Sequence, residues 1–574
     1  MIAGALKRQV QGGEFNYIDA HFADMLARLA QTTGTRASPA LIPWFARLSH
    51  ALTRQHSCLD LSSLPESDEL IAELTSLSIV GSPADTNFPL ILDGTRLYMQ
   101  RYFQYESRIA NALAERNRLL DDIDVAQAIE ITRSRFPETG WQQVAALQAL
   151  TRQLSIITGG PGTGKTTTVV RIIRAIVELA GEEIPAIRLA APTGKAAMRL
   201  MEALREQNLP VDLEVQTLHR LLGMRADGRS YRHGPEFPVT ADLLIVDEVS
   251  MIDLAMMHRL VGALRADARV ILLGDPGQLP SVEAGNILAD ICKHPAGYTS
   301  AFADIAKQVG MVLPITDSGH RLADAICELK QSYRFLPDKG IGRLSHAIRA
   351  GDNITIEDDE EVTFTSLAAF GADQQVAVYE HYIDTLAATR DPLTRLATFE
   401  QNRILSPVRE GPHGVVAINA AIESTLMDRG LIDLHEPYYP GRPILVTRND
   451  YNLALFNGDI GICLPDETTG EPMVMFRDTE GEPRSYLVSR LPPHETCYAM
   501  TVHKSQGSEF DHVVLMVPTP STAAGWQLMT RELIYTAVTR ARHKVTLCYE
   551  GDVLRQCLAN RNARFSGLGD RLLA

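Results

Sequence analysis

The sequence has 574 residues, too many for one hydrophobic core, so three or four domains are expected. Its 55 lysines and arginines face 70 aspartates and glutamates, and the net charge of −15 argues against a protein coated with nucleic acid, although a local basic channel is compatible with it. The seven cysteines form no CxxC pair, the N-terminus lacks the apolar core of a signal peptide, and no stretch approaches the ~18 apolar residues that span a membrane.

These absences predict a cytoplasmic protein with reduced thiols, no zinc or iron–sulfur site and no membrane partner.

The first region, residues 1–110, is expected to be a helical domain. Apolar residues recur at helical spacing in FNYIDAHFADMLARLAQ and in LIPWFARLSHALTRQ. No catalytic constellation is visible there. We interpret this region as a structural or subunit-docking domain.

From about residue 140 the pattern changes to short buried strands followed by helices, which is typical of a βαβ series with a parallel sheet. The first set of strands is LSIIT, IRLAA, LLIVD and RVILL, and a second set is RILSP, HVVLMV and VTLCY. The fold class is therefore α/β with two such domains. We assign the first domain to 111–324 and the second to 325–420 and 496–574.

A phosphate-binding loop is predicted between the strand LSIIT and the helix that follows it. The segment GGPGTGKTTT matches G-x-x-x-x-G-K-[ST] with Gly159, Gly164, Lys165 and Thr166. The glycines let backbone N–H groups turn toward phosphate oxygens, and the helix N-terminus adds positive potential. Lys165 is expected to reach the β- and γ-phosphates of ATP, and the Thr166 hydroxyl to bind Mg²⁺. The remaining residues of the predicted cradle are Gly160, Pro161, Gly162 and Thr163.

Two adjacent carboxylates, Asp247 and Glu248, end the buried strand in LLIVDEVSM. Such a pair is costly to bury unless it serves a cation or a reaction. Asp247 is the expected second ligand of Mg²⁺, and Glu248 is placed to act as the general base that activates water. Gln278, in LLGDPGQLPSVEAG after the next strand, is a candidate sensor of the γ-phosphate, and a turn-stabilising amide is the alternative.

Between 421 and 495 the residue pattern differs from that of the flanking α/β segments. Short strands in PILVTRND, GDIGICL, PMVMF and RSYLVSR alternate with glycine-containing turns. This pattern predicts a small antiparallel β-barrel inserted into the second α/β domain. The segment after it, TVHKSQGSEF (501–510), is polar although it lies between two apolar stretches.

The ordered set of segments is specific. It comprises GGPGTGKT, APTGKAA, TLHRLLG, DEVS, GDPGQLPSV, SYR, HKSQGSEF and YTAVTRA. Together they resemble the superfamily 1B helicases, and among these the alpha subunits of bacterial exodeoxyribonuclease V, the RecD family. The resemblance covers about residues 141–545. It implies two RecA-like P-loop motor domains, and it identifies the inserted barrel with an SH3-like subdomain that borders DNA.

The resemblance also assigns further residues of the ATP site. It implies that Arg334 and Arg540 supply positive charge to the γ-phosphate from the second motor domain, although Arg409 and Arg542 are competing candidates. It further implies that Gln142 recognises adenine. Gly507 and Glu509 would lie near the nucleotide.

The DNA-binding residues are likewise implied by the resemblance. They are Pro192, Thr193, Thr217, His219, Thr501 and His503. Contacts of this kind hold a strand without reading its sequence. The stretch 224–241 carries Asp-Gly at 227–228, a hairpin turn signal. It corresponds to the family's strand-separating wedge, and a plain surface hairpin is the alternative.

The resemblance implies an ATP-dependent 5′→3′ DNA helicase that acts on double-stranded DNA ends and single-stranded DNA. It would assemble with the beta and gamma subunits of exodeoxyribonuclease V for recombinational repair of double-strand breaks. No nuclease constellation is seen in this chain, so the nuclease is expected in the beta subunit. Two alternatives are a stand-alone DNA or RNA translocase and a non-motor scaffold that binds ATP as a switch.

Overall fold

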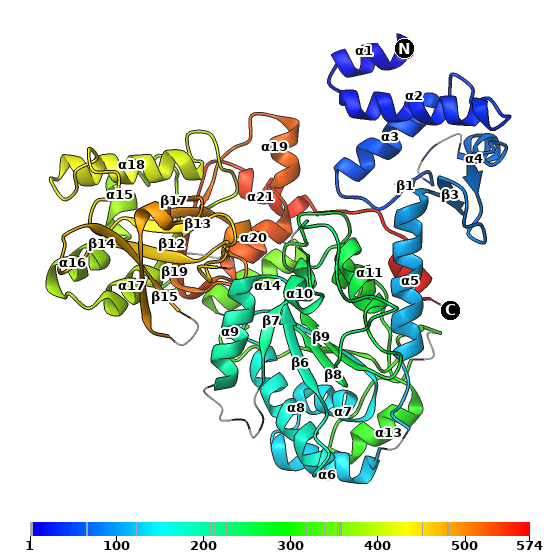
Figure 1. The fold of residues 1–574 in the computed structure, drawn as a ribbon, viewed down its shortest axis with the longest axis horizontal. Helices are drawn as coiled ribbons and strands as arrows, with labels where there is room; N and C mark the ends of the chain where they lie inside the picture. Colours follow the sequence, from blue (N-terminus) through cyan, green and yellow to red (C-terminus); the bar gives the residue numbers. More distant parts are fainter. Residues whose placement is uncertain are drawn as a thin grey trace.

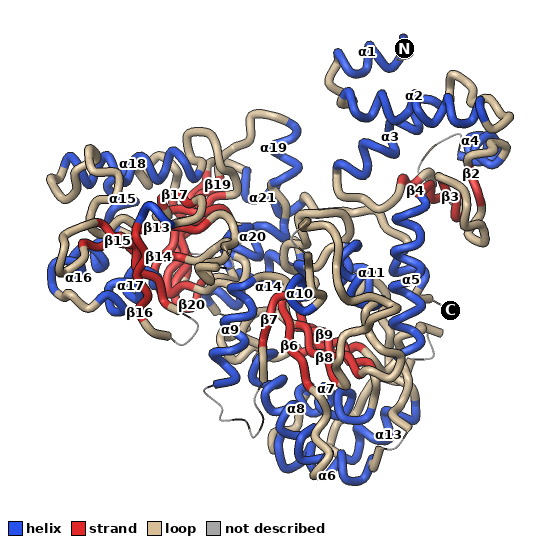
Figure 2. Tube along the Cα trace, in the orientation of Figure 1, coloured by secondary structure: helices blue, strands red, loops and turns tan. Residues whose placement is uncertain are grey.

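The computed structural model describes residues 4–573, except 63, 65–66, 122, 206–208, 210, 212, 226, 317–318, 338, 353, 355–358, 451 and 479–480. Two parallel sheets with flanking helices lie side by side, and the N-terminal region projects from the first of them (Figures 1 and 2). The α/β class and the two parallel sheets of the sequence prediction are confirmed.

The N-terminal region combines helices with a small sheet. Its helices are α1 (Gly4–Gln11), α2 (Tyr17–Thr32), α3 (Ile42–Thr53) and α4 (Ser67–Thr75). Its strands are β1 (Leu59–Asp60), β2 (Val80–Gly81), β3 (Leu90–Asp93) and β4 (Arg96–Met99), in the order β1-β4-β3-β2. The predicted helices are present, and the small sheet was not predicted. Strands of two to four residues are too short to show an alternating pattern.

Helix α5 (Gln100–Arg116) joins this region to the first parallel sheet (Figure 1). Its residues Ile109 and Leu113 are buried in the same core as Leu154 and Leu244 of that sheet. The predicted domain boundary at residue 110 thus falls inside one continuous helix. It needs correction because α5 belongs to both parts.

The first sheet has six parallel strands in the order β10-β5-β9-β8-β6-β7. The strands are β5 (Leu154–Gly159), β6 (Ile187–Ala191), β7 (Val215–Thr217), β8 (Leu243–Val246), β9 (Arg269–Gly274) and β10 (Ile326–Leu329). Ile156 and Ile157 enter two different cores, one on each face of the sheet. Because β10 pairs with β5, the predicted boundary at 324 lies too early in the chain.

Helices cover both faces of the first sheet. They are α6 (Val125–Arg135), α7 (Trp141–Thr151), α8 (Lys165–Ala180), α9 (Gly194–Arg205), α10 (Leu218–Leu221), α11 (Leu254–Gly262), α12 (Ile287–Ile291) and α13 (Ser300–Gln308), with a 3₁₀ turn at Val249–Met251. The stretch 224–241 forms a hairpin: Met224 pairs with Tyr231, and the Asp227 carboxylate accepts backbone bonds from Arg229 and Ser230. Residue 226 of this predicted hairpin lies outside the described residues.

The second sheet is also parallel, in the order β11-β20-β19-β12-β18. Its strands are β11 (Val362–Thr365), β12 (Asn402–Ser406), β18 (Ala499–Thr501), β19 (Phe510–Val517) and β20 (Ala541–Tyr549). The helices around it are α14 (Gly340–Ala350), α15 (Ala372–Ala377), α16 (Glu380–Ala388), α17 (Pro392–Gln401), α18 (Val415–Asp428), α19 (Ala523–Leu528), α20 (Arg531–Val538) and α21 (Val553–Ala559), with a 3₁₀ turn at His503–Ser505.

A five-stranded antiparallel sheet is inserted between β12 and β18. Its strands are β13 (Pro443–Val446), β14 (Ile460–Pro465), β15 (Pro472–Arg477), β16 (Pro483–Leu487) and β17 (His494–Thr496), in the order β16-β15-β14-β13-β17, with a 3₁₀ turn at Val488–Arg490. The four predicted strands are present. The predicted start at residue 421 falls inside α18, so the sheet begins later than expected.

The C-terminal segment leaves the second sheet and returns to the first. After α21 the chain crosses to α22 (Leu568–Arg571), which packs against α5 (Figure 1). Leu568 and Leu572 are buried in the core on that face of the first sheet. The assignment of residues up to 574 to the second motor domain is therefore wrong for this last segment. Its few apolar residues give no sequence signal for which core they join.

All seven cysteines are free thiols, and six of them are buried. Within the described part of the chain, no helix is long and apolar enough to cross a membrane. The described residues also contain no group of three histidines, cysteines or carboxylates that could hold a metal ion.

Candidate nucleotide site between the two parallel sheets

The loop between β5 and α8 has the backbone of a phosphate cradle. Gly162 and Gly164 have φ values of 73° and 75°, a left-handed conformation that favours glycine. A Cβ on Gly162 would clash with the Arg334 Cβ, so the two segments approach closely. Lys165 is the first residue of α8, and its Nζ donates to the carbonyl oxygens of Gly159 at 2.5 Å and Gly160 at 3.0 Å. The helix N-terminus and Lys165 give this loop positive potential.

This loop opens into a cavity of about 440 Å³ between the two sheets. Thirteen of the predicted site residues line it: Pro161, Gly162, Thr163, Gly164, Lys165, Thr166, Asp247, Glu248, Gln278, Arg334, Gly507, Glu509 and Arg540. All six predicted catalytic residues are among them. The cavity therefore unites groups that lie as far apart in the sequence as Pro161 and Arg540.

The two adjacent carboxylates follow β8. The Asp247 Oδ1 accepts a bond from the Glu248 backbone N–H at 2.8 Å, and burial together with the Glu248 charge raises the pKa of Asp247. Glu248 has a φ of 53°, an uncommon and strained conformation for a residue other than glycine. A bound cation would offset the cost of holding the half-buried Asp247 carboxylate beside the Glu248 charge, so the residues present fit a Mg²⁺ held by Thr166 and Asp247.

Arg540 connects the second sheet to Gln278, which follows β9 of the first. The Arg540 side chain is 3% exposed, and its Nη2 donates to Gln278 Oε1 at 2.9 Å. Gln278 Nε2 donates to Asp275 Oδ2 at 3.3 Å, and the Tyr535 hydroxyl donates to the same oxygen at 3.1 Å. Gln278 is thus held by polar groups from both sheets, which suits a group that reports the state of the nucleotide to both.

Glu509 is the centre of an arginine cluster at the edge of the cavity. Arg334 Nη2 donates to both Glu509 oxygens at 2.8 Å, Arg199 Nη2 lies 3.0 Å from Oε2, and Arg542 Nε lies 3.3 Å from it. Burial would raise the pKa of Glu509, but Arg199 and Arg334 outweigh it and hold the pKa at about 2. Since Arg199 lies on α9 of the first sheet, this carboxylate joins the two halves of the site.

The buried Nη1 of Arg334 has no hydrogen-bond partner among the described residues. A buried guanidinium nitrogen without a partner is costly, and an anion in the cavity would satisfy it. This observation agrees with a triphosphate as the ligand.

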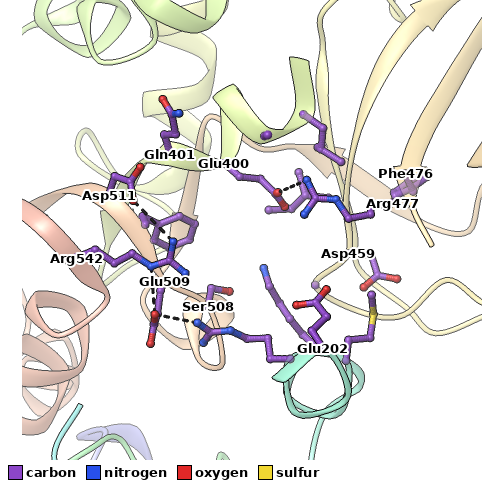
Figure 3. Close-up of a pocket in the computed structure, with 18 residues that line it drawn as sticks. Glu202, Glu400, Gln401, Asp459, Phe476, Arg477, Ser508, Glu509, Asp511 and Arg542 are labelled. Atoms are coloured by element: carbon purple, nitrogen blue, oxygen red, sulfur yellow. Dashed lines mark hydrogen bonds and ion pairs between the residues drawn. The ribbon is translucent and has the colours of Figure 1, made fainter. Parts of the chain in front are cut away.

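A second cavity, of about 290 Å³, lies beside the first and shares Arg199 and Glu509 with it. Figure 3 shows Arg477 and Glu400 pointing toward each other on one side of this cavity, while Arg542 approaches Glu509 and Asp511 on the other. The inserted antiparallel sheet supplies Arg477. The Glu509 cluster therefore lies at the contact between α9, the second sheet and the inserted sheet.

Replacing Glu509 with glutamine is expected to lower the free energy of unfolding by about 2 kcal/mol, because arginine side chains that donate charged hydrogen bonds would lose their carboxylate. Arg542→Gln is the matched control. The Arg542 side chain is 49% exposed, so its pair with Glu509 is screened by solvent and its loss should cost less than about 1 kcal/mol. Urea unfolding followed by tryptophan fluorescence measures both.

The effect of Glu509→Gln on the free energy of unfolding should depend on pH, because the pKa of Glu509 is lowered in the folded chain. The Glu509 contribution is fully present above its ordinary pKa of 4.5 and is lost as the pH falls toward about 2. The stability difference between Glu509→Gln and the unsubstituted chain should be constant above about pH 5 and shrink at lower pH. Equal effects of Glu509→Gln and Arg542→Gln would contradict a central role for this carboxylate.

The remaining predicted nucleotide residues lie beside the cavity. A Cβ on Gly164 would come 3.0 Å from Gln142 Nε2, so Gln142 is adjacent to the phosphate loop. Gly160 lines a neighbouring cavity on the other side of the loop. Of the competing arginines, Arg409 pairs with Glu495 at 2.7 Å and does not line the cavity.

None of the six predicted DNA-binding residues, all of which the structure describes, lines the nucleotide cavity. They lie at the ends of β6, β7 and β18 or within two residues after them, and each is partly exposed: Pro192, Thr193, Thr217, His219, Thr501 and His503. Thr193 and Thr217 follow or end β6 and β7, and their hydroxyls accept backbone bonds at the starts of α9 and α10. His503 lines a different cavity, about 550 Å³ in volume. Their assignment to DNA stays a prediction.

Two groups in the nucleotide site were not predicted from the sequence. Arg199 lines both cavities and pairs with Glu509, and Tyr333 lines the nucleotide cavity beside Gly164. Arg199 follows APTGKAA by two residues and Tyr333 directly precedes Arg334, so proximity to recognised motifs was the available signal.

Three family models match separate parts of the chain. The model of the RecBCD enzyme subunit RecD, N-terminal domain, matches residues 11–72. An AAA domain model matches 142–284, and a UvrD-like helicase C-terminal domain model matches 496–548. These matches cover the N-terminal region and the two segments that contribute most of the nucleotide cavity.

The RecBCD enzyme subunit RecD of Mycobacterium tuberculosis (strain CDC 1551 / Oshkosh) is 34% identical over 605 residues, which cover 99% of this chain and 97% of that protein. The ATP-dependent RecD2 DNA helicase of Deinococcus radiodurans is 30% identical over 75% of this chain and 52% of its own length. The crystal structure of Pif1 helicase from Bacteroides in complex with ADP-AlF3 and ssDNA has a TM-score of 0.37 and 18% identity, over 70% of this chain and 90% of that one.

Proposed function

The chain belongs to the RecD family and is an ATP-dependent DNA helicase, and from this premise we propose that it is the 5′→3′ motor subunit of a three-subunit helicase and nuclease. Its partners are the beta and gamma subunits of exodeoxyribonuclease V. The complex takes double-stranded DNA ends in the cytoplasm, and it unwinds and degrades them for recombinational repair. We assign the nuclease chemistry to the beta subunit.

The observation that supports a motor most strongly is the composite cavity. Lys165, Glu248 and Gln278 come from the first parallel sheet, whereas Arg334 and Arg540 come from segments outside it. A γ-phosphate held from both sides joins the sheets, and its loss on hydrolysis releases them. A nucleotide switch without turnover would not require Glu248 in the same cavity.

The residues act on ATP by positioning and electrostatics. The backbone of 160–164 and the α8 N-terminus bind the phosphates, and Lys165 with Arg334 and Arg540 neutralises charge on the γ-phosphate. Glu248 accepts a proton from the attacking water. A Mg²⁺ held by Thr166 and Asp247 would neutralise further phosphate charge. Gln142, beside Gly164, contacts adenine.

Hydrolysis of ATP by the purified full-length chain, with and without single-stranded DNA, tests this function. We expect slow basal hydrolysis that single-stranded DNA stimulates. A rate that does not respond to DNA would contradict a DNA motor.

We further propose that one DNA strand crosses the strand ends that carry the six predicted contact residues. The inserted antiparallel sheet serves as an SH3-like subdomain beside this path, and the hairpin at 224–241 separates or guides the strands. Thr193 and Thr501, at the ends of β6 and β18, would contact the strand from the two parallel sheets.

Replacing His503 with alanine should weaken the coupling between DNA and ATP. We expect about a tenfold rise in the DNA concentration that half-saturates ATP hydrolysis, because a contact worth about 1.4 kcal/mol is lost. The KM for ATP should change much less, since His503 does not line the nucleotide cavity. Steady-state titrations with single-stranded DNA and with ATP give both values. Equal changes in both would mean that His503 only supports the loop.

We propose that α2 carries the surface that docks the gamma subunit. Ile18, Met25 and Leu29 are 66%, 53% and 36% exposed, and their spacing of seven and four residues places them on one helix face. The family model of the RecD N-terminal domain includes this helix. The match to 97% of a RecD subunit, against 52% of the RecD2 helicase, also supports a subunit over a stand-alone translocase.

The double substitution Ile18→Glu and Met25→Glu should abolish co-purification with the beta and gamma subunits, because two charges would enter an apolar interface. The melting temperature should be unchanged, since both side chains are already exposed. Val312→Glu, at a position 86% exposed on the first motor, is the matched control and should leave assembly intact. Normal assembly of the double variant would show that docking lies elsewhere.

A further inference from the structure

The cavity that contains His503 is assembled from His503 and four other, distant parts of the chain. The four other parts are residues 53–56 of the N-terminal region, 279–282 after β9, 527, 528 and 530 before α20, and 560–564 of the C-terminal segment. In Figure 1 the C-terminal segment crosses from α21 toward α5, past the end of the N-terminal region. The volume of the cavity is about 550 Å³. The predicted motifs supply only part of this cavity.

Arg564 holds these parts together. Its Nη1 donates to the carbonyl oxygens of Glu283 at 2.8 Å and Gly285 at 2.6 Å, and its Nη2 donates to Ser281 O at 2.7 Å and Gln55 Oε1 at 2.5 Å. Gln55 in turn donates through Nε2 to the Val282 carbonyl, and its own carbonyl accepts from Gly285 N at 3.1 Å. The positive φ of Gln55, 68°, is maintained by these contacts.

The charged side chains that line the cavity are all cationic. The lining contains three arginines and two histidines and no carboxylate: the basic residues are Arg54, His56, His503, Arg561 and Arg564. This is unusual in a chain with a net charge of −15. Burial and the positive charges of Arg54 and Arg564 lower the pKa of His56 to about 4. The arginines of the cavity therefore favour the neutral form of His56.

Arg54 and Arg561 are exposed, and neither guanidinium has an ion-pair partner among the described residues. Two carboxylates belong to neighbouring residues, but neither lines the cavity: Glu532 accepts a bond from Asn562 N at 2.9 Å, and Glu283 is exposed on its loop. Unpaired arginines on a carboxylate-free wall are suited to phosphate groups.

We propose that this cavity is a phosphate-binding site on the path of single-stranded DNA, in which Arg54 of the N-terminal region and Arg561 of the C-terminal segment contact the strand. The inference rests on the proposed function, because His503 lines the same cavity. The neutral amides of Gln55, Gln527 and Asn562 and the exposed side chains of Val282 and Leu528 complete a surface without base-specific geometry. Such a surface binds the backbone independently of sequence.

The N-terminal region then has a second role besides docking. It places a cationic loop next to the segment that follows Gln278, so a strand in this cavity touches residues directly connected to the nucleotide site. Gln506 Nε2 donates to Leu279 O at 3.0 Å, and Thr536 Oγ1 accepts from Leu279 N at 2.8 Å. DNA in the cavity would therefore lie against Leu279, the residue that directly follows Gln278 in the sequence.

The test uses the full-length chain with Arg54→Gln and Arg561→Gln combined, and binding of a fluorescein-labelled oligothymidine measured by anisotropy at several salt concentrations. We expect about a tenfold or larger loss of affinity at low salt, and a slope of log K against log salt that is smaller in magnitude by about 1.4, because two phosphate contacts are removed. Circular dichroism and the melting temperature identify an unfolded variant. In that case the single variants replace it, each with an expected change in slope of about 0.7.

The matched control combines Arg28→Gln and Arg555→Gln, which removes two exposed arginines that pair with Asp24 and Asp552 outside the cavity. Unchanged binding by the control, with a reduced slope for the cavity variant, supports the proposal. If both variants bind like the unsubstituted chain, or lose binding equally, the proposal is overturned while the helicase function stands. If the unsubstituted chain itself fails to bind oligothymidine, the proposed function fails together with the inference.

Discussion

Replacing Glu248 with glutamine is expected to lower the turnover of ATP by about 10²-fold or more, because glutamine keeps the shape of the side chain and cannot accept the proton of the attacking water. ATP should still bind, since the phosphate loop and Lys165 are untouched. Glu248 lines the nucleotide cavity, as does Asp247, the residue before it. Steady-state hydrolysis in the presence of single-stranded DNA gives kcat, and a fluorescent ATP analogue gives the dissociation constant.

Glu202→Gln is the matched control for this substitution. Glu202 lines the adjacent cavity that shares Arg199 and Glu509, but it does not line the nucleotide cavity (Figure 3). Its replacement should leave kcat within about twofold, since a change of less than about 0.4 kcal/mol is expected there. An unchanged kcat for Glu248→Gln would show that another group activates the water.

The second large effect is expected for Lys165→Gln, which should abolish detectable ATP hydrolysis. The lysine charge is lost from the end of the phosphate loop, where the β- and γ-phosphates would lie. Folding should be preserved, because the Lys165 side chain contacts the carbonyl oxygens of Gly159 and Gly160 and no apolar core. Hydrolysis assays, together with the melting temperature and co-purification with the other subunits, separate loss of chemistry from loss of structure.

Arg171→Gln serves as the control for Lys165, because Arg171 is an exposed cation on the same helix and does not line the nucleotide cavity. It should hydrolyse ATP at the rate of the unsubstituted chain. DNA-stimulated hydrolysis by Lys165→Gln at a near-normal rate would refute the phosphate loop as the ATP site.

The strands that were predictable from sequence are those with continuous apolar runs. β5, β6, β8 and β9 are buried on both faces, and their sequences show it directly. β7 and β10 were missed because they have three and four residues and carry polar positions. The small N-terminal sheet was also not predicted, because its strands have only two to four residues. Tertiary pairing, which local sequence does not encode, makes these short segments into strands.

The nucleotide site shows the same division. Lys165 and Glu248 belong to contiguous motifs, and the residue types of these motifs indicate phosphate binding and general-base chemistry. The sequence alone therefore identified both residues. Arg334 and Arg540 are single arginines without a local pattern, and only the resemblance to a helicase family selected them over Arg409. Arg199 was missed because its function arises from a contact with Glu509, more than 300 residues later in the chain. Contacts between sheets are visible only in the folded chain.

We propose that ATP hydrolysis in the composite cavity drives this chain along DNA in the 5′→3′ direction. This proposal is tested most directly by unwinding of two DNA duplexes, one with only a 5′ single-stranded tail and one with only a 3′ tail, by the purified full-length chain. We expect ATP-dependent unwinding of the 5′-tailed duplex alone, and no unwinding of either duplex by Lys165→Gln. Unwinding of the 3′-tailed duplex, or unwinding that persists in Lys165→Gln, would contradict the proposal.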